Sequence, residues 1–374
     1  MKQMDEQLKK YVEEMYDTFH KIPEKGMEEY KTSALVAEKL REFGYEVTDH
    51  VGGKTGVIGV WDTGKEGPVL GLRADMDALE YVIDGKKEMR HTCGHDAHTS
   101  MLLTAAKAIK EQDLVKKGKL VLIFQPAEEK FNGALSMIDS GLLNGITNLI
   151  GMHVRPVDDT CSGKATPDMW HSATMMMQCR IKGVNAHGAR PHLGVNAVDV
   201  AAAVVNAINA IKEKPDVPHS IKVTNISVGG DTYNAIPDNA FMAIDIRSQN
   251  NEVMESMVKK TDRIFENITK AYGAEYELIS RGGVPAAEYD DDMIKFAEQS
   301  IKNVLGEDAS IGTLYNPGGE DFHYMTQRLK CKSTYIGLGA DAAPGLHHKD
   351  MHLNKGALIY GVEIWLDVVK RMLG

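Results

Sequence analysis

The residues best suited to chemistry lie in one short stretch, His91 to His98, with the sequence HTCGHDAH. Cys93 and His95 are two positions apart, so in an extended backbone their side chains leave on the same side and converge. Thiolate and imidazole both bind zinc and similar divalent metals, and Asp96 could hold a ligating histidine or bridge a second ion. The alternative is a buried cysteine beside a polar turn that caps the next helix. The density of histidines favours the metal site.

Further residues of ligand type follow predicted strands. In α/β proteins the chemistry lies outside the carboxyl ends of the strands, so donors at several strand ends are expected to meet. The strands and the residues that follow them are 68–73 before Asp75 and Asp77, 120–124 before Glu128 and Glu129, and 149–152 before His153. Each alone has a structural alternative: a polar loop, first-turn acids of a helix, or a structural histidine. A second dense histidine loop, 345–352, adds His347.

These donors are too many for one ion. A tetrahedral zinc needs four ligands, so two ions that share a bridge, either Cys93 or a carboxylate, are the economical arrangement. Two adjacent glutamates can have different roles: one binds metal and the other acts as a general base. The base takes a proton from a metal-bound water, which then attacks a carbonyl. The donors are Cys93, His95, Glu129, His153 and His347, with Glu128 left over.

The frame around these residues is of the α/β class. At 374 residues the chain is long enough for two domains or for one large domain with an insertion. Strand and helix patterns alternate up to about residue 173 and resume from about 285. Between them, residues 174–284 read as strand, helix, strand, strand, helix, strand, which predicts an inserted ferredoxin-like α+β domain. We therefore expect a metal-binding catalytic domain of 1–173 and 285–374, and an inserted dimerisation or lid domain.

Composition excludes several partner classes. The formal charge of −10 argues against a nucleic-acid or anionic-membrane surface, because such partners require clustered Lys and Arg. The first twenty residues have no apolar core like that of a signal peptide, and no run of eighteen apolar residues occurs. The four cysteines are widely spread and form no Cys-x-x-Cys pair. A cytoplasmic protein is expected.

Seven motifs, in order along nearly the whole chain, resemble the dinuclear-metal aminoacylase/carboxypeptidase family. The resemblance is to its amidohydrolase branch, which includes N-acyl-amino-acid, hippurate and auxin-conjugate hydrolases. It implies a central mixed sheet flanked by helices, as in zinc exopeptidases, with two divalent ions (Zn, or Mn, Co or Ni). The motifs are LRADMDAL from Leu72, CGHDAHT from Cys93, FQPAEE from Phe124, Gly151-Met152-His153, Gly183–Pro191, Asn234-x-Ile236-Pro237-Asp238 and Gly319-Glu320-Asp321-Phe322.

The resemblance also implies roles for individual residues. Cys93, His95, Glu129, His153 and His347 correspond to metal ligands, and Glu128 corresponds to the general base. Asp75 corresponds to a residue that orients the site from behind the ligands. His187 corresponds to a substrate-polarising histidine that is usually supplied across a dimer interface, so a homodimer or higher homo-oligomer through the inserted domain is implied.

The chain departs from the family pattern at three places. A short charged stretch follows Glu80-Tyr81 where the family has Pro and a longer segment, and Lys130-Phe131-Asn132-Gly133 replaces a glycine run. The last ligand lies in Leu-His-His-Lys-Asp, which leaves both His347 and His348 open. No departure removes a donor.

Two functions are compatible with these residues. The first is a metal-dependent amidohydrolase that cleaves N-acyl amino acids or small peptides with a free carboxylate. The carboxylate could be held by Asn234, Arg247, the loop 185–190, or the backbone at Gly318 and Gly319, each of which could instead be structural. The second is a non-catalytic metal- or peptide-binding protein on the same scaffold. Glu128 separates the two, because a binding protein needs no base beside its ligand.

Overall fold

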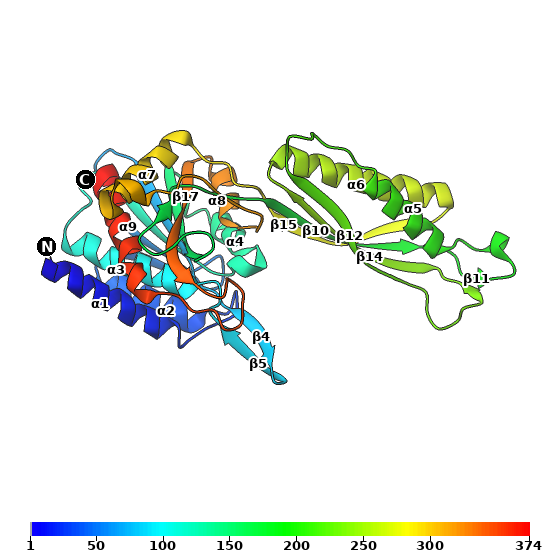
Figure 1. Ribbon diagram of the computed structural model, residues 1–374, viewed down its shortest axis with the longest axis horizontal. Coiled ribbons are helices and arrows are strands. Elements are labelled where there is room, and N and C mark those ends of the chain that lie inside the picture. The colour runs from blue at the N-terminus through cyan, green and yellow to red at the C-terminus, as the bar shows by residue number, and fades with distance from the viewer. Residues whose placement is uncertain (1) are drawn as a thin grey trace. The chain divides into compact units, whose positions relative to one another are not determined.

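The computed structural model describes residues 2–374, which form two compact units (Figure 1). The first unit contains the chain up to Trp170 together with Glu288–Tyr315 and Glu320–Gly374. The second contains His171–Ala287 and Asn316–Gly319, so the domain predicted at 174–284 lies within it.

The first unit is built on a seven-stranded mixed sheet with the order β1-β2-β6-β3-β7-β17-β8. The four central strands, β6, β3, β7 and β17, are parallel to one another. The outer strands β1, β2 and β8 pair antiparallel. The carboxyl ends of the four parallel strands therefore meet at one edge of the sheet. The strands are β1 Glu46–Val51, β2 Gly56–Asp62, β3 Val69–Asp75, β6 Lys119–Gln125, β7 Asn148–Pro156, β8 Ala165–Thr166 and β17 Lys332–Ala342.

Both faces of this sheet are buried. Along β6, Leu122 and Phe124 pack in one apolar cluster while Val121 and Ile123 pack in another, as the alternation of side chains in a strand requires. The first cluster includes residues of α1 Lys2–Phe19, α2 Tyr30–Glu42, α3 His95–Glu111, α7 Asp291–Leu305 and α9 Leu358–Leu373. The second includes residues of α4 Gly133–Asp139 and α8 Phe322–Leu329, two helices that the sequence patterns did not predict.

A β-hairpin, β4 Leu79–Ile83 and β5 Lys86–Arg90, occupies the charged stretch that departs from the family pattern. Asp84 and Gly85 connect the strands with φ values of 50° and 77°, the left-handed pair that a two-residue type I′ turn requires. The remaining short elements are η1 Glu128–Lys130, η3 Glu307–Ala309, η4 Lys355–Ala357 and the ribbon of β9 Met169–His171 with β16 Leu314–Asn316.

The second unit is a four-stranded antiparallel sheet with the order β12-β14-β10-β15 and two helices on one face (Figure 1). Alternate residues of β14 are buried against the helices, and Val204, Ile244 and Phe265 lie in this core. The chain order agrees with the predicted strand, helix, strand, strand, helix, strand pattern. The elements are β10 Ala173–Lys182, β11 Ala186–His187, η2 Pro191–Leu193, α5 Ala197–Asn209, β12 His219–Val228, β13 Ala235–Ile236, β14 Asn239–Ser248, α6 Asn251–Tyr272 and β15 Glu275–Val284.

Within the described part of the chain, every helix is too short or too polar to span a bilayer.

Candidate metal centre

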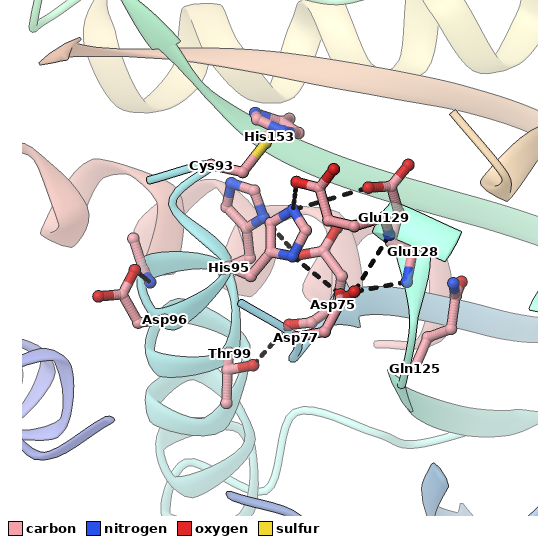
Figure 2. Close-up of polar contacts among 12 residues, drawn as sticks. Asp75, Asp77, Cys93, His95, Asp96, Thr99, Gln125, Glu128, Glu129 and His153 are labelled. Carbon is pink, nitrogen blue, oxygen red and sulfur yellow. Dashed lines mark hydrogen bonds and ion pairs between the residues drawn. The ribbon is translucent and has the colours of Figure 1, made fainter. Parts of the chain in front are cut away.

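The carboxyl edge of the parallel strands gathers the predicted donors from four segments of the first unit. His153 lies near the end of β7, and Glu128 and Glu129 form the first turn of η1 after β6. Cys93 and His95 lie at the start of α3, and His347 lies in the loop after β17. Figure 2 shows Cys93, His95, His153 and the two glutamates pointing toward one another.

Their ligand atoms form three overlapping groups, each with all atoms within 4.8 Å of one another. The groups are Cys93 with His95 and His153, Cys93 with Glu129 and His347, and His95 with Glu128 and Glu129. Cys93 Sγ lies 3.5 Å from His153 Nε2 and 3.2 Å from His347 Nε2, so the thiol stands between two histidines. Cys93 therefore belongs to two of the three groups.

The structure also separates the two histidines of the last loop. His347 Nε2 lies 3.2 Å from Glu129 Oε1, and the Tyr81 hydroxyl donates a 2.8 Å hydrogen bond to the His347 carbonyl. His348 is exposed, and its Nδ1 accepts the backbone N–H of Asp350. His347 is therefore the histidine that faces the other donors.

The backbone at Cys93 and His95 differs from the extended segment that we expected. Gly94 has φ of 83°, in the left-handed region, and α3 begins at His95, three residues earlier than predicted. A Cβ at position 94 would lie 2.4 Å from Val154 Cγ2, so glycine is needed both for the turn and for the approach of β7. Cys93 and His95 converge through this tight turn and not through strand geometry.

Hydrogen bonds set the tautomers of two histidines so that their Nε2 atoms can accept. His95 Nδ1 donates to Asp77 Oδ1 at 3.1 Å, and His153 Nδ1 donates to the Val154 carbonyl at 2.6 Å. Within residues 2–374, the buried His95 Nε2 atom has no hydrogen-bond partner, and the buried Glu129 Oε1 atom has only the 3.2 Å ion-pair contact with His347 Nε2. Buried polar atoms are normally paired, so these unpaired lone pairs fit a bound cation.

The two adjacent glutamates have opposite protonation behaviour. Burial raises the pKa of Glu128 well above its usual range, and the charges of Glu320 and Glu129 add to this effect. Burial also acts to raise the pKa of Glu129, but the close contact with His347 and the charge of His95 outweigh it and leave this pKa below its ordinary value. One carboxyl is suited to hold a proton while its neighbour stays anionic.

Asp75 was expected to orient the site, and its direct hydrogen-bond partner is His98. Asp75 Oδ1 accepts from His98 Nδ1 at 2.6 Å, and His98 Nε2 accepts the backbone N–H of Val154 at 2.9 Å. Asp75 is 3.8 Å from His95, whereas Asp77 is the carboxylate that holds the His95 ring. Asp77 was predicted only as a ligand-type residue after a strand and His98 had no predicted role, although His three positions after a ligand was a visible signal.

The residues predicted to contact substrate all lie in the second unit. His187 is exposed on β11, and its Nδ1 accepts the Ala189 N–H at 3.0 Å. Asn234 is exposed, and its carbonyl accepts the Gly188 N–H.

The second unit also contains a cavity of about 360 Å³. Arg247 lines the cavity, and its Nε donates to Asp245. Gly318 donates its N–H to Asn316 Oδ1, next to Pro317 in the cavity wall. A Cβ at Gly319 would lie 2.6 Å from Val284 Cγ2, which is a packing reason for that glycine.

Comparison with known proteins gives the same class. The model of peptidase family M20/M25/M40 matches residues 71–371. The chain is 32% identical to hippurate hydrolase of Campylobacter jejuni, with 87% of each chain covered, and 30% identical to N-acetyl-L-cysteine deacetylase of Bacillus subtilis, with 95% of this chain and 86% of that protein covered. The crystal structure of Bacillus subtilis YXEP, described as a dinuclear metal binding peptidase, superimposes with a TM-score of 0.80 at 25% identity and covers 98% of this chain and 99% of that one.

The fold, the cluster of donors and these matches together define a metal-dependent hydrolase. The chain belongs to peptidase family M20/M25/M40.

Proposed function

We propose that the protein cleaves the amide bond of N-acyl amino acids or small peptides that carry a free carboxylate. The observation that carries this proposal is the convergence of thiol, imidazole and carboxylate donors beside a second, buried carboxyl with a raised pKa. Relatives named for hippurate and N-acetylcysteine hydrolysis support the substrate class. In this proposal two divalent ions, Zn or else Mn, Co or Ni, are held by Cys93, His95, Glu129, His153 and His347.

The bound ions would supply Lewis acidity, which lowers the pKa of a coordinated water from about 15.7 toward 7 and polarises the amide carbonyl. Glu128 takes the proton of the attacking water and returns it to the leaving nitrogen. Its Oε2 lies 3.8 Å from His95 Nε2, within the donor cluster, and its carboxyl is almost fully buried. Both features suit a general base that must also hold a proton.

On the substrate side, we propose that Arg247, Asn234 and the backbone at Gly318 and Gly319 contact the free carboxylate. Arg247 supports this best, because it borders a cavity and its side chain is about 42% exposed, with Asp245 as an ion-pair partner at 3.1 Å. Asp77 would orient the His95 imidazole, and Asp75 would orient the neighbouring His98 ring.

We further propose that His187 donates to the oxyanion of the partner's site in a homodimer formed by the second unit. Because His187 Nδ1 accepts the Ala189 N–H, the proton of the neutral ring lies on Nε2, ready to be donated. An oxyanion donor of this kind is worth about 3–4 kcal/mol. β12 and β15 end the four-stranded sheet, and pairing with a second copy would cover such an edge.

Subunit exchange tests this arrangement. His187→Ala and Glu128→Ala proteins are mixed, and each homodimer is expected to be nearly inactive while the heterodimer regains one complete site. Exchange that is proven by a tag on one subunit, with no recovery of activity, would exclude a histidine supplied across the interface.

We also propose that the protein is cytoplasmic and has no nucleic-acid or membrane partner. The charge of −10 and the four free thiols support it.

Metal depletion tests the proposed reaction. Acetyl-, benzoyl- and indole-acyl amino acids and dipeptides are offered to purified, chelator-treated protein, and then again after zinc, manganese, cobalt or nickel is restored. We expect amide hydrolysis to disappear with the metal and return with it. Full activity in protein shown to be metal-free would reject the proposal.

A further inference from the structure

The turn that carries the two glutamates is held by carboxylates from outside the turn. Asp77 accepts the backbone N–H groups of Glu128 and Glu129, each at 3.1 Å, through its two oxygens. The amide just before them, that of Ala127, donates to Glu29 Oε1 at 2.8 Å. Three consecutive N–H groups are thus bound by two carboxylates that are themselves buried.

This turn has a backbone conformation that needs support. Ala127 has φ of 51° and ψ of 43°, the left-handed region, which is unfavourable for a residue with a Cβ and persists only where its surroundings fix it. Glu128 follows directly, and Glu129 follows that. Since the backbone dihedrals at Ala127 decide where the next side chains point, whatever fixes this residue also aims the two glutamates.

Glu29 comes from a segment far away in sequence, just before α2. Its side chain is inaccessible to solvent, and its second oxygen, Oε2, accepts the Thr55 hydroxyl at 2.5 Å. The same segment packs directly against the turn, because a Cβ at Gly26 would lie 2.9 Å from Ala127 Cα, and Lys130 donates to the Gly26 carbonyl. Glu29 is in none of the ligand groups found among residues 2–374, so it has no direct role toward a metal.

We propose that Glu29 is a positioning residue for the catalytic centre, a role that rests on the proposed function. By holding the Ala127 amide, it aims Glu129 at His347, 3.2 Å away, and keeps Glu128 at the neighbouring position facing His95. The carboxylate of Glu29 thereby sets both the affinity for the divalent ions and the place of the base, although it touches neither substrate nor metal.

The test compares two substitutions at this position. In Glu29→Gln the amide oxygen still accepts the Ala127 N–H and the amide N–H₂ donates to Thr55, so zinc affinity, kcat and KM stay within about threefold of the wild type. In Glu29→Ala the hydrogen bond to the Ala127 N–H is lost, and zinc affinity measured by chelator competition falls by about 10–100-fold, as for other residues that support metal ligands. Its kcat falls too, with KM changed less.

A matched control is Glu24→Ala. Glu24 lies in the same segment and also binds backbone N–H groups, those of Lys31 and Thr32 at the start of α2. If these glutamates only stabilise the segment, Glu24→Ala and Glu29→Ala both lower the melting temperature without a specific effect on zinc binding. Only Glu29→Ala is expected to weaken zinc binding in folded protein at 25 °C.

Two results would overturn the proposal. The first is Glu29→Ala protein that is folded and keeps the wild-type zinc affinity and kcat. The second is an equal loss of zinc affinity in Glu24→Ala. If Glu29→Ala does not fold, Glu29→Asp replaces it in the first of these tests, because the side chain is shorter by one methylene and its carboxylate is drawn away from the Ala127 N–H. Failure of the proposed function gives a different pattern: wild-type protein that binds zinc but hydrolyses none of the amides.

Discussion

Arg73 is the residue whose removal should most damage the frame behind the site. It is fully buried, and each of its five N–H donors has an acceptor. Burial opposes its charge, but the surrounding acids, first among them Glu320, raise the pKa of Arg73 well above its usual value. The acceptors are Gln125 Oε1 at 2.9 Å, Asp75 Oδ2 at 2.5 Å, the Tyr335 hydroxyl at 3.0 Å, Glu320 Oε1 at 2.9 Å and Asp321 Oδ1 at 3.2 Å.

We predict that Arg73→Met lowers the free energy of unfolding by about 3–5 kcal/mol, because it leaves Asp75, Glu320 and Asp321 without their cation. For a unit of this size, each kcal/mol shifts the melting temperature by about 2–4 °C, so a fall of about 6–20 °C is expected. Arg41→Met is the control, since Arg41 pairs with Asp49 at an exposed site where such a pair is worth about 0–1 kcal/mol.

The penalty should also depend on pH. Burial already raises the pKa of Asp321 to about 8, and loss of Arg73 raises it further, above its value in the unfolded chain. A carboxyl with a raised folded pKa is tolerated when protonated and becomes destabilising as pH rises. The difference in melting temperature between variant and wild type should therefore be larger at pH 8 than at pH 5. Calorimetry with chelator present measures it, and equal melting temperatures, or a gap that widens toward low pH, would refute this reasoning.

Two further substitutions test the supports of the site. Tyr81→Phe removes the hydrogen bond to the His347 carbonyl, which is worth about 0.5–1.5 kcal/mol, and should weaken zinc binding about 2–10-fold in chelator competition. The control Val82→Thr, on the exposed side of the hairpin, should leave zinc binding unchanged. Equal zinc affinities of Tyr81→Phe and the wild type would contradict the role of the hairpin. Gly133→Ala would place a Cβ 1.6 Å from the Pro126 carbonyl and should lower stability by about 1–3 kcal/mol and reduce turnover, so an unchanged melting temperature would show that the turn is not tightly packed.

The frame of the site was predictable because it follows from local patterns. Continuous apolar runs such as 120–124 indicate strands buried on both faces, and parallel strands end at one edge, so ligand-type residues after them meet. The structure places Glu129 and His153 at that edge, together with Cys93 from the turn just before α3. The mixed sheet and the family were correctly predicted from these patterns and motifs.

The supports of the site could not be predicted because they depend on contacts between distant residues. The Ala127 amide meets Glu29 across 98 positions, and Arg73 meets Asp321 across 248. Neither spacing leaves a periodic signal. The hairpin around Asp84-Gly85 is different: Asp-Gly between short strands is a local hairpin signal, and it was visible in the charged stretch.

The most direct test of the account is Glu128→Gln, with metal content and turnover measured on the same sample. Glutamine preserves the size of the side chain but cannot take a proton, and Glu128 is not among the five proposed ligands. We predict two bound ions per chain, as in the wild type, together with a fall in kcat for the best N-acyl amino acid of about 10²–10⁴-fold. Wild-type turnover with both ions bound would contradict the assignment of Glu128 as the base.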